Sequence, residues 1–332
     1  RVRTISGVTP VTVLTKPFPC PGNCIFCPND GAMPKSYLSK EPGAQRAGKN
    51  LFDPYLQTNN RLAALKNIGH PTDKVELIIL GGSWNYYPEN YQRWFIKRCF
   101  DAMNDFDRDK SDRITPKVKP KEEKTSWDEL DKVQKENETS SCRCIGLVIE
   151  TRPDLINKEE IIKIRRLGAT KVQIGVQCLN DEILKMNNRG HTVAETKKAF
   201  EVLRLAGFKI HAHWMPNLYG STPKKDYLDY KELFTSDFYK PDELKFYPCT
   251  LVENTRLMDL YKEGKWEPYS DEVLLDLAKK CFLATPRYCR ITRVIRDISA
   301  EDIVAGTKKS NLRQLVNQKL DEQKEKPVEI RY

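Results

Sequence analysis

The chain has 332 residues, of which 39% are hydrophobic and 31% charged, an ordinary balance for a folded globular protein. This length predicts one large α/β domain or a domain with a substantial extension. The longest apolar runs, such as 75–80, are far shorter than the roughly 20 residues of a membrane span, so no membrane partner is expected. The net charge of +10 makes polyanions the first partners to consider.

Cysteine usage indicates a metal site rather than disulfides. Cys20, Cys24 and Cys27 lie within eight residues, and no other cysteine follows until Cys99. Three thiolates at this spacing can hold one metal centre in a reducing compartment. A cubane of iron and sulfide held this way leaves one iron open to another ligand. No signal peptide is recognised, so the cytoplasm is the expected location.

Two other metal sites stay open for these three cysteines. One is a zinc knuckle completed by a distant histidine or cysteine, although zinc sites usually contain two C-x-x-C-like pairs. The other is an electron-transfer cluster with Cys99 as fourth ligand. The cysteines outside the trio are expected to be buried apolar residues, namely Cys99, Cys142, Cys144, Cys178, Cys249, Cys281 and Cys289.

Strand and helix patterns alternate along the chain. Strands are predicted at 8–14, 75–80, 145–149, 171–176, 208–214 and 243–247. Helices are predicted at 51–68, 91–103, 158–167, 181–186, 193–206, 255–261 and 271–282, and the proline-containing segment 28–57 is read as a long loop. This alternation predicts a parallel sheet with right-handed crossovers, and six strands instead of eight predict a partial (β/α)6 barrel of the TIM type.

Composition divides the chain into a barrel domain at 1–250 and a C-terminal extension at 251–332. Within the barrel domain, the apolar-poor segment at about 105–141 is read as an exposed charged insertion. In the extension, residues 287–319 contain eight basic and three acidic residues. The extension is therefore expected to carry a basic surface.

Polar or glycine residues follow the predicted strands and mark a candidate site. The carboxyl ends of parallel strands meet at one edge of a sheet, where ligands of α/β folds bind. The residues at these ends are the three cysteines, Gly81, Gly82, Glu150, Gln177, Asn217 and Tyr247. All are expected to face one mouth.

The spacing Cys-x-x-x-Cys-x-x-Cys, directly after the first strand of such a barrel, resembles the radical S-adenosylmethionine (SAM) superfamily. The resemblance implies a [4Fe–4S] cluster held by Cys20, Cys24 and Cys27, with SAM on the open iron. It further implies that Gly81, Gly82 and Ser83 form the motif facing the methionine amino group. Glu150 and Gln177 stand where this fold holds the sulfonium and the ribose.

Longer stretches resemble the catalytic subunit of Elongator in its single-chain archaeal or bacterial form. These stretches are 15–22, 33–37, 41–44, 69–76, 150–154, 188–192 and 295–298. The resemblance implies transfer of an acetyl-CoA-derived unit to C5 of the wobble uridine in the tRNA anticodon stem-loop. It also implies an external electron donor, and it leaves open a homodimer or Elongator-type partner proteins.

The resemblance gives Lys74 a catalytic, acetyl-CoA-contacting role, although on residue type alone it is a solvated lysine before a strand. The acetyltransferase domain of the family is expected after residue 332, and no pyrophosphate-binding loop of that domain occurs in this sequence. The chain is therefore expected to bind the cluster, SAM and tRNA without completing acetyl transfer alone.

Seven basic residues of the extension are expected to follow the phosphates of tRNA, with a merely solvated basic face as the alternative. They are Arg287, Arg290, Arg293, Arg296, Lys308, Lys309 and Arg313. His191, His211 and His213 are expected to be hydrogen-bonded core residues. Two rival functions remain: a metal-stapled RNA-binding module without redox chemistry, and a radical enzyme with a substrate other than tRNA.

Overall fold

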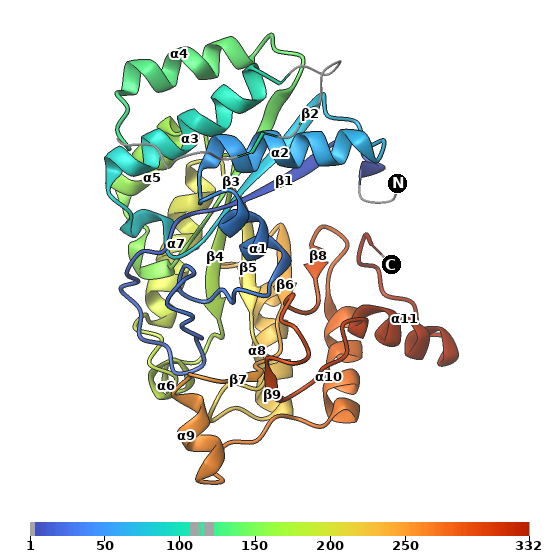
Figure 1. Cartoon of the computed structure of the whole chain (residues 1–332). Helices are drawn as coiled ribbons and strands as arrows, with labels where there is room; N and C mark the ends of the chain where they lie inside the picture. Colours follow the sequence, from blue (N-terminus) through green and yellow to red (C-terminus); the bar gives the residue numbers. More distant parts are fainter. Residues whose placement is uncertain (1–3, 107–111, 113, 116–122, 332) are drawn as a thin grey trace. The chain divides into compact units, whose positions relative to one another are not determined.

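Figure 1 shows the computed structural model, which describes residues 4–106, 112, 114–115 and 123–331. Part of the predicted insertion at 105–141 lies outside the described residues. The chain divides into two compact units. The first unit comprises Arg1–Cys20, Gly31–Glu150 and Ile162–Lys171, and the second comprises Pro21–Asp30, Thr151–Ile161 and Val172–Tyr332.

Seven strands form one sheet in the order β1-β2-β3-β4-β5-β6-β8, which confirms the predicted parallel α/β architecture. The strands are β1 (Thr9–Leu14), β2 (Lys74–Leu80), β3 (Arg143–Thr151), β4 (Lys171–Gln177), β5 (Lys209–Trp214), β6 (Glu243–Phe246) and β8 (Arg290–Arg293). Six correspond to predicted strands, and β8 is a seventh that was not predicted. A separate antiparallel pair joins β7 (Leu251–Val252) to β9 (Ile303–Ala305).

Helices connect most of these strands. They are α1 (Pro42–Lys49), α2 (Pro54–Asn67), α3 (Glu89–Asn104), α4 (Trp127–Asn137), α5 (Lys158–Arg166), α6 (Asp181–Met186), α7 (Val193–Leu205), α8 (Pro223–Thr235), α9 (Leu257–Lys262), α10 (Asp271–Ala284) and α11 (Leu312–Glu322). None of the helices within the described ranges is long and apolar enough to cross a membrane.

The edge strand β1 is completed by a side chain of α2. The backbone N–H of Leu14 donates to Oε1 of Gln57 at 2.9 Å, and Nε2 of Gln57 donates to the Leu14 carbonyl at 2.9 Å. Both residues are buried, so water does not reach the backbone groups of Leu14. The side-chain amide of Gln57 makes the two hydrogen bonds that a neighbouring strand would otherwise make. This pair fixes the last residue of β1, from which the chain continues to Cys20.

Helix α4 lies within the predicted insertion and packs alongside α3 (Figure 1). Leu130 and Val133 of α4 are buried. At the end of α4, Nδ2 of Asn137 donates to the Cys142 carbonyl at 3.0 Å, and Oδ1 of Asn137 accepts from the Cys144 N–H at 2.7 Å. The insertion therefore contains an ordered helix that guides the chain into β3.

The core of the second unit is an aromatic cluster between the sheet and its helices. The ring of Trp214 in β5 lies 4.9 Å from Tyr230 of α8, and Phe246 of β6 lies 6.4 Å from Phe282 of α10. All four side chains are fully buried, and the Tyr230 hydroxyl is bonded to Thr285 at 2.7 Å. Such burial and edge-to-face contact hold α8 and α10 against β5 and β6.

We expect Gln57→Ala to lower the free energy of unfolding by about 2–3 kcal/mol, because it leaves two buried backbone groups of Leu14 without partners. Urea unfolding followed by circular dichroism measures this change. Gln45→Ala, at an exposed position of α1, is the control and should stay within about 0.5 kcal/mol of wild type. Equal stability of the two variants would show that Gln57 does not hold the edge strand.

Candidate functional site

In the first unit, hydrogen bonds fix the segment that leads from β1 to Cys20. The Thr15 N–H donates to the Leu80 carbonyl at 2.9 Å, which extends the pairing of β1 with β2. The Tyr87 hydroxyl donates to the Lys16 carbonyl at 2.9 Å, and the Lys16 N–H donates to the Tyr91 hydroxyl at 3.1 Å. Burial raises the pKa of Tyr87 to about 12, so this donor keeps its proton at neutral pH.

Gly81 is required by its contact with Thr15. A Cβ atom at Gly81 would lie 1.8 Å from Oγ1 of Thr15, and the φ of +147° also disfavours other residues. At Gly82 the nearest atom to such a Cβ, the Tyr87 hydroxyl, would be 3.7 Å away. The first glycine of the motif therefore lets the ends of β1 and β2 approach each other.

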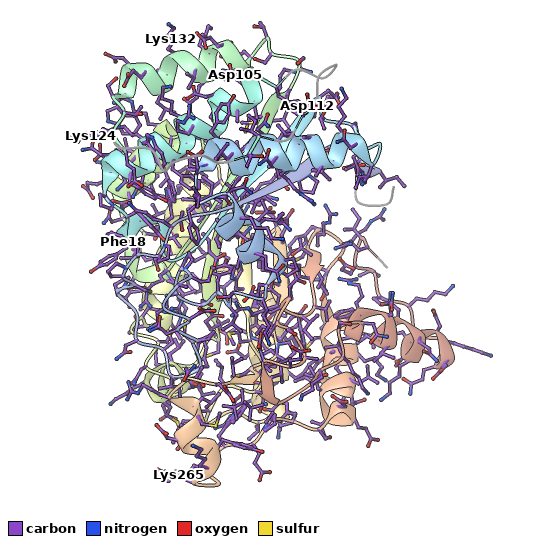
Figure 2. All side chains as sticks on the ribbon, in the orientation of Figure 1. Phe18, Asp105, Asp112, Lys124, Lys132 and Lys265 are labelled. Atoms are coloured by element: carbon purple, nitrogen blue, oxygen red, sulfur yellow. The ribbon has the colours of Figure 1, made fainter. Side chains whose placement is uncertain are left out.

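Cys20 and Ser83 lie side by side beyond these strand ends, with 3.8 Å between Sγ and Oγ. Phe18, labelled in Figure 2, stacks on Tyr87 with the ring centroids 4.9 Å apart. Phe18 also meets Tyr86 edge to face at 6.2 Å, and 45% of the Tyr86 surface is exposed. An accessible aromatic surface thus accompanies the first cysteine.

In the second unit, Ile25 anchors the loop that carries Cys24 and Cys27. The Ile25 N–H donates to the Asn187 carbonyl at 3.1 Å, and the Ile25 carbonyl accepts from the Leu257 N–H at 2.9 Å. Its side chain is buried in an apolar cluster with Ile183, Leu184, Leu218, Leu251, Leu257 and Trp266. Residues from the predicted extension therefore help to hold the cysteine loop.

Arg189 is the cationic neighbour of this loop. Its Nη1 lies 3.6 Å from Sγ of Cys24, and its Nη2 donates to the Gly175 carbonyl at 2.7 Å. The carbonyl of Arg189 accepts from Nη2 of Arg152 at 2.7 Å, and Arg152 forms an ion pair of 2.9 Å with Asp154. Arg189 lies in the stretch 188–192, whose resemblance to the Elongator catalytic subunit is the available signal, but the sequence alone predicts no role for it.

Several buried polar atoms of the second unit have no hydrogen-bond partner among the described residues. They are Oγ1 of Thr151, Oε1 of Gln177, Nε of Arg189 and both ring nitrogens of His191. Gln177 ends β4 with a φ of +68°, a strained conformation typical of functional sites. Burying such atoms without partners is unfavourable, so they suit a polar ligand that supplies the missing bonds.

The cysteine trio has the donor set that an iron–sulfur cluster needs. All three cysteines are of intermediate exposure. Among the described residues, no three His, Cys, Asp or Glu side chains are placed to share one metal ion. In a cubane each thiolate binds a different iron, so this donor set fits a cluster without meeting at one point.

The other predicted site residues lie in different places. Glu150 is half-buried near the end of β3. Lys74 is exposed at the first position of β2, and the length of that strand separates it by roughly 20 Å from Gly81. The structure therefore brings Cys20, Gly81 and Ser83 together in the first unit but does not bring Lys74 to them.

Five of the seven predicted tRNA-binding residues are exposed, and two of these five, Arg293 and Lys309, also form ion pairs. Arg287 and Lys308 are exposed, as is Arg290 on β8. The others have intramolecular interactions: Arg293 pairs with Asp297, Lys309 with Asp271 at 3.1 Å, and Arg313 donates to the Ile291 carbonyl at 2.6 Å, while Arg296 is half-buried. Arg313 in particular ties α11 to β8, and its burial lowers its pKa.

The remaining cysteines and histidines are mostly core residues, as predicted. All seven such cysteines are buried except Cys144, which is intermediate. Nε2 of His211 is bonded to Thr292 at 2.8 Å, and Nε2 of His213 is bonded to Gln173 at 3.1 Å. His191 is equally buried but differs, because the described residues offer neither ring nitrogen a hydrogen bond.

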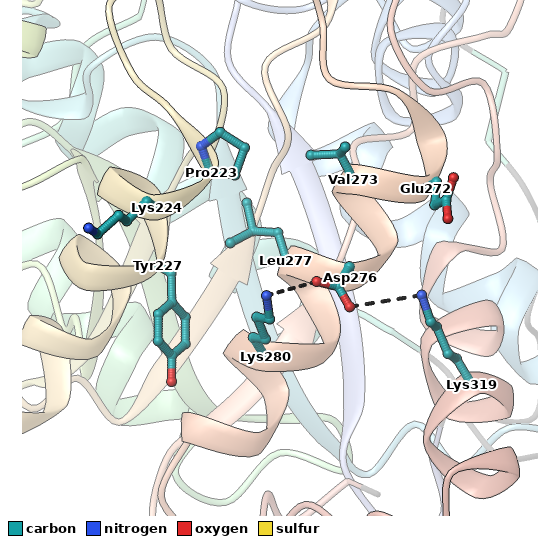
Figure 3. A pocket seen from close by; sticks show the side chains of 9 residues that line it. All are labelled: Pro223, Lys224, Tyr227, Glu272, Val273, Asp276, Leu277, Lys280 and Lys319. Carbon is teal, nitrogen blue, oxygen red and sulfur yellow. Dashed lines mark ion pairs between the residues drawn. The ribbon is translucent and has the colours of Figure 1, made fainter.

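A cavity of about 560 Å³ lies elsewhere, between α8, α10 and α11 (Figure 3). Asp276 at its wall pairs with Lys280 at 2.9 Å and with Lys319 at 3.9 Å. The described residues that line this cavity all belong to helices: Pro223, Lys224, Tyr227, Glu272, Val273, Asp276, Leu277, Lys280 and Lys319. It is therefore separate from the strand-end residues described above.

Comparison with known families identifies the superfamily of this chain. Residues 19–226, more than half of the chain, match the model of the Radical SAM superfamily. The chain belongs to the radical SAM superfamily. A second match, to the radical SAM C-terminal domain, covers residues 241–322. The predicted fold class is thereby confirmed, and members of this superfamily use a [4Fe–4S] cluster and SAM.

Relatives within the radical SAM superfamily confirm the resemblance to the Elongator catalytic subunit. The chain is 44% identical over 321 residues to a tRNA uridine(34) acetyltransferase of Methanocaldococcus infernus, covering 95% of this chain and 57% of the relative. It is 35% identical to Elongator complex protein 3 of Danio rerio, covering 95% and 56%. The chain thus spans a little over half the length of these curated relatives.

A solved structure also shows the similarity to the Elongator catalytic subunit. The archaeal Elp3 of Methanocaldococcus infernus, with residues 1–46 deleted, matches with a TM-score of 0.79 at 38% identity, covering 98% of this chain and 65% of that chain. The hydrogenase maturase HydG matches with a TM-score of 0.52 at 12% identity, which indicates a shared fold alone.

We expect His191→Gln to reduce the loss of stability of the metal-free chain in acid. Burial, then the charges of Arg189 and Arg152, lower the pKa of His191 to about 2, whereas an unfolded histidine titrates near 6.5. As the pH drops below about 6.5, His191 gains a proton in the unfolded chain but stays neutral in the folded chain. The free energy of unfolding therefore falls as the pH drops below this value. The slope is up to about 1.4 kcal/mol per pH unit for each such histidine.

Urea unfolding between pH 5 and pH 8 measures this slope. Burial also lowers the pKa of His213, so the His191→Gln variant should keep part of the slope. A variant with the full wild-type slope would show that His191 is protonated in the folded chain.

Proposed function

We propose that this chain is the radical SAM part of a cytoplasmic tRNA wobble-uridine acyltransferase, which adds an acetyl-CoA-derived unit to C5 of the uridine. The observation that carries the proposal is the 44% identity, over 95% of this chain, to a tRNA uridine(34) acetyltransferase. The three cysteines of intermediate exposure, and the unpartnered polar atoms of the second unit, support the radical SAM part of this conclusion. An external one-electron donor is part of the proposal, as are a homodimer or Elongator-type partners.

In this proposal Cys20, Cys24 and Cys27 hold a [4Fe–4S] cluster. When bound, the cluster and SAM together supply hydrogen-atom abstraction from an unactivated carbon. Ser83 would lie beside the cluster ligand Cys20, because its Oγ is 3.8 Å from Sγ of Cys20. The loop around Ile25 keeps Cys24 and Cys27 in place through its two backbone hydrogen bonds.

SAM would be oriented by polar groups that now lack partners. Oε1 of Gln177, which has no partner among the described residues, would accept a hydrogen bond from a ribose hydroxyl. By the family resemblance, the backbone at Gly81 and Gly82 would face the methionine amino group. Glu150, half-buried at the end of β3, would lie near the sulfonium. For Lys74, contact with acetyl-CoA remains a proposal that rests on the family resemblance, because the residue lies at the far end of β2.

Substrate tRNA would meet the basic residues of the second unit. Arg287, Arg290 and Lys308 are exposed and suit contact with phosphates. Beside Cys20, the exposed ring of Tyr86 and its neighbour Phe18 suit stacking with an unpaired base. Phosphate contacts would position the RNA, and the flipped-out uridine would enter the site.

Anaerobic reconstitution tests the cofactor. We expect about four irons and four sulfides per chain, visible absorption, and 5′-deoxyadenosine when SAM and a reductant are added. Cys24→Ala should abolish both cluster and product, whereas Cys289→Ala, a buried cysteine of the same unit, should retain them. Stoichiometric zinc without SAM cleavage would instead support a metal-stapled RNA-binding module.

Charge reversal tests the RNA substrate. Arg290→Glu should weaken tRNA binding and lower the slope of log affinity against log salt by about 1, because one phosphate contact is lost. Lys132→Glu, at an exposed position of α4 labelled in Figure 2, should leave both unchanged. If wild-type chain with an intact cluster does not bind tRNA, the substrate is of another class.

A further inference from the structure

The contact between Arg189 and Cys24 joins a buried cation to a predicted cluster ligand. Arg189 is 6% exposed, and its Nη1 is 3.6 Å from Sγ of Cys24. We infer that Arg189 donates a hydrogen bond to the cluster-bound sulfur of Cys24 and thereby raises the reduction potential of the cluster. This inference rests on the proposed [4Fe–4S] cluster and deepens its assignment.

The guanidinium is held in place from two sides. Nη2 donates to the Gly175 carbonyl at 2.7 Å in β4, which leaves Nη1 directed at the sulfur. The backbone of Arg189 is tied to Arg152, whose own charge is paired with Asp154. A guanidinium with this support has a fixed direction, so its hydrogen bond does not depend on a flexible chain.

Gly175 gives Arg189 the space that this position requires. A Cβ atom at Gly175 would lie 2.5 Å from Nη2 of Arg189 and 3.1 Å from Nε2 of Gln177. Even alanine at Gly175 would therefore displace the guanidinium without changing its chemistry. The strand thus contains a glycine where Arg189 approaches its backbone, which is what a fixed donor needs.

The expected effect on the cluster has a definite sign. Reduction adds one negative charge to the cluster and its thiolates. A nearby positive charge and an N–H donor to sulfur stabilise the reduced form more than the oxidised form, and buried surroundings strengthen both effects. Removing this charge and this donor lowers the reduction potential of the cluster. An electron donor of lower potential is then needed to reduce it.

Potentiometric titration of the reconstituted chain, followed by electron paramagnetic resonance, tests the inference without using activity. Arg189→Gln should lower the ratio of reduced to oxidised cluster at least tenfold at a fixed potential, which corresponds to 59 mV for one electron. Gly175→Ala should shift the potential in the same direction, and Arg189→Lys should shift it less than Arg189→Gln. The double variant Gly175→Ala/Arg189→Gln should add little to Arg189→Gln alone.

Arg204→Gln is the matched control, because this arginine of the same unit is exposed and pairs with Asp242. The reduction potential of this variant should equal that of wild type. A wild-type potential in Arg189→Gln with full iron content would overturn the inference, as would a variant that changes only SAM affinity. If Arg189→Gln does not fold, Arg189→Lys and Gly175→Ala give the same test. Failure of the wild-type chain to assemble any cluster would instead refute the proposed cofactor.

Discussion

Parallel pairing is the constraint on which the site depends. A strand that pairs in parallel with its neighbour needs a crossover connection, and its carboxyl end lies at the same edge as that of its neighbour. In the first unit this places Thr15 beside Leu80 and brings Cys20 to Ser83. In the second unit it places Gln177 at the end of β4, with its carbonyl accepting from Met215 after β5.

Six strands of the sheet were predictable because buried parallel strands are apolar runs with clear ends. Four described helices, α1, α4, α8 and α11, were not predicted, and for the first three the physical reason lies in the sequence. Proline suggested a loop at α1, yet Pro42 occupies its first turn, where no backbone N–H is needed. Pro223 does the same at α8, where Thr222 caps the helix. Helix α4 escaped prediction because few of its residues are apolar, and two of those, Leu130 and Val133, provide its buried contact.

Spacing along the chain is enough to predict a role for the cysteine trio, and that role stays a prediction. Contacts between distant residues left no such pattern. Nothing in the sequence alone places Arg189 against Cys24, 165 positions away, or Leu257 against Ile25. The basic spacing around β8 was equally ambiguous, because pairing with β6 and not the charges determines that this segment is a strand.

These long-range contacts link the charge of the site to folding. Arg152 and Arg189 are both buried, which is unfavourable for a cation unless an opposite charge lies close. Asp154 supplies that charge for Arg152, whereas the Arg189 side chain contacts the Gly175 carbonyl and the Cys24 sulfur. In the proposed cluster Cys24 is a thiolate, so cluster assembly would provide Arg189 with its counter-charge. Cluster binding should therefore stabilise the fold of the second unit as well as complete its chemistry.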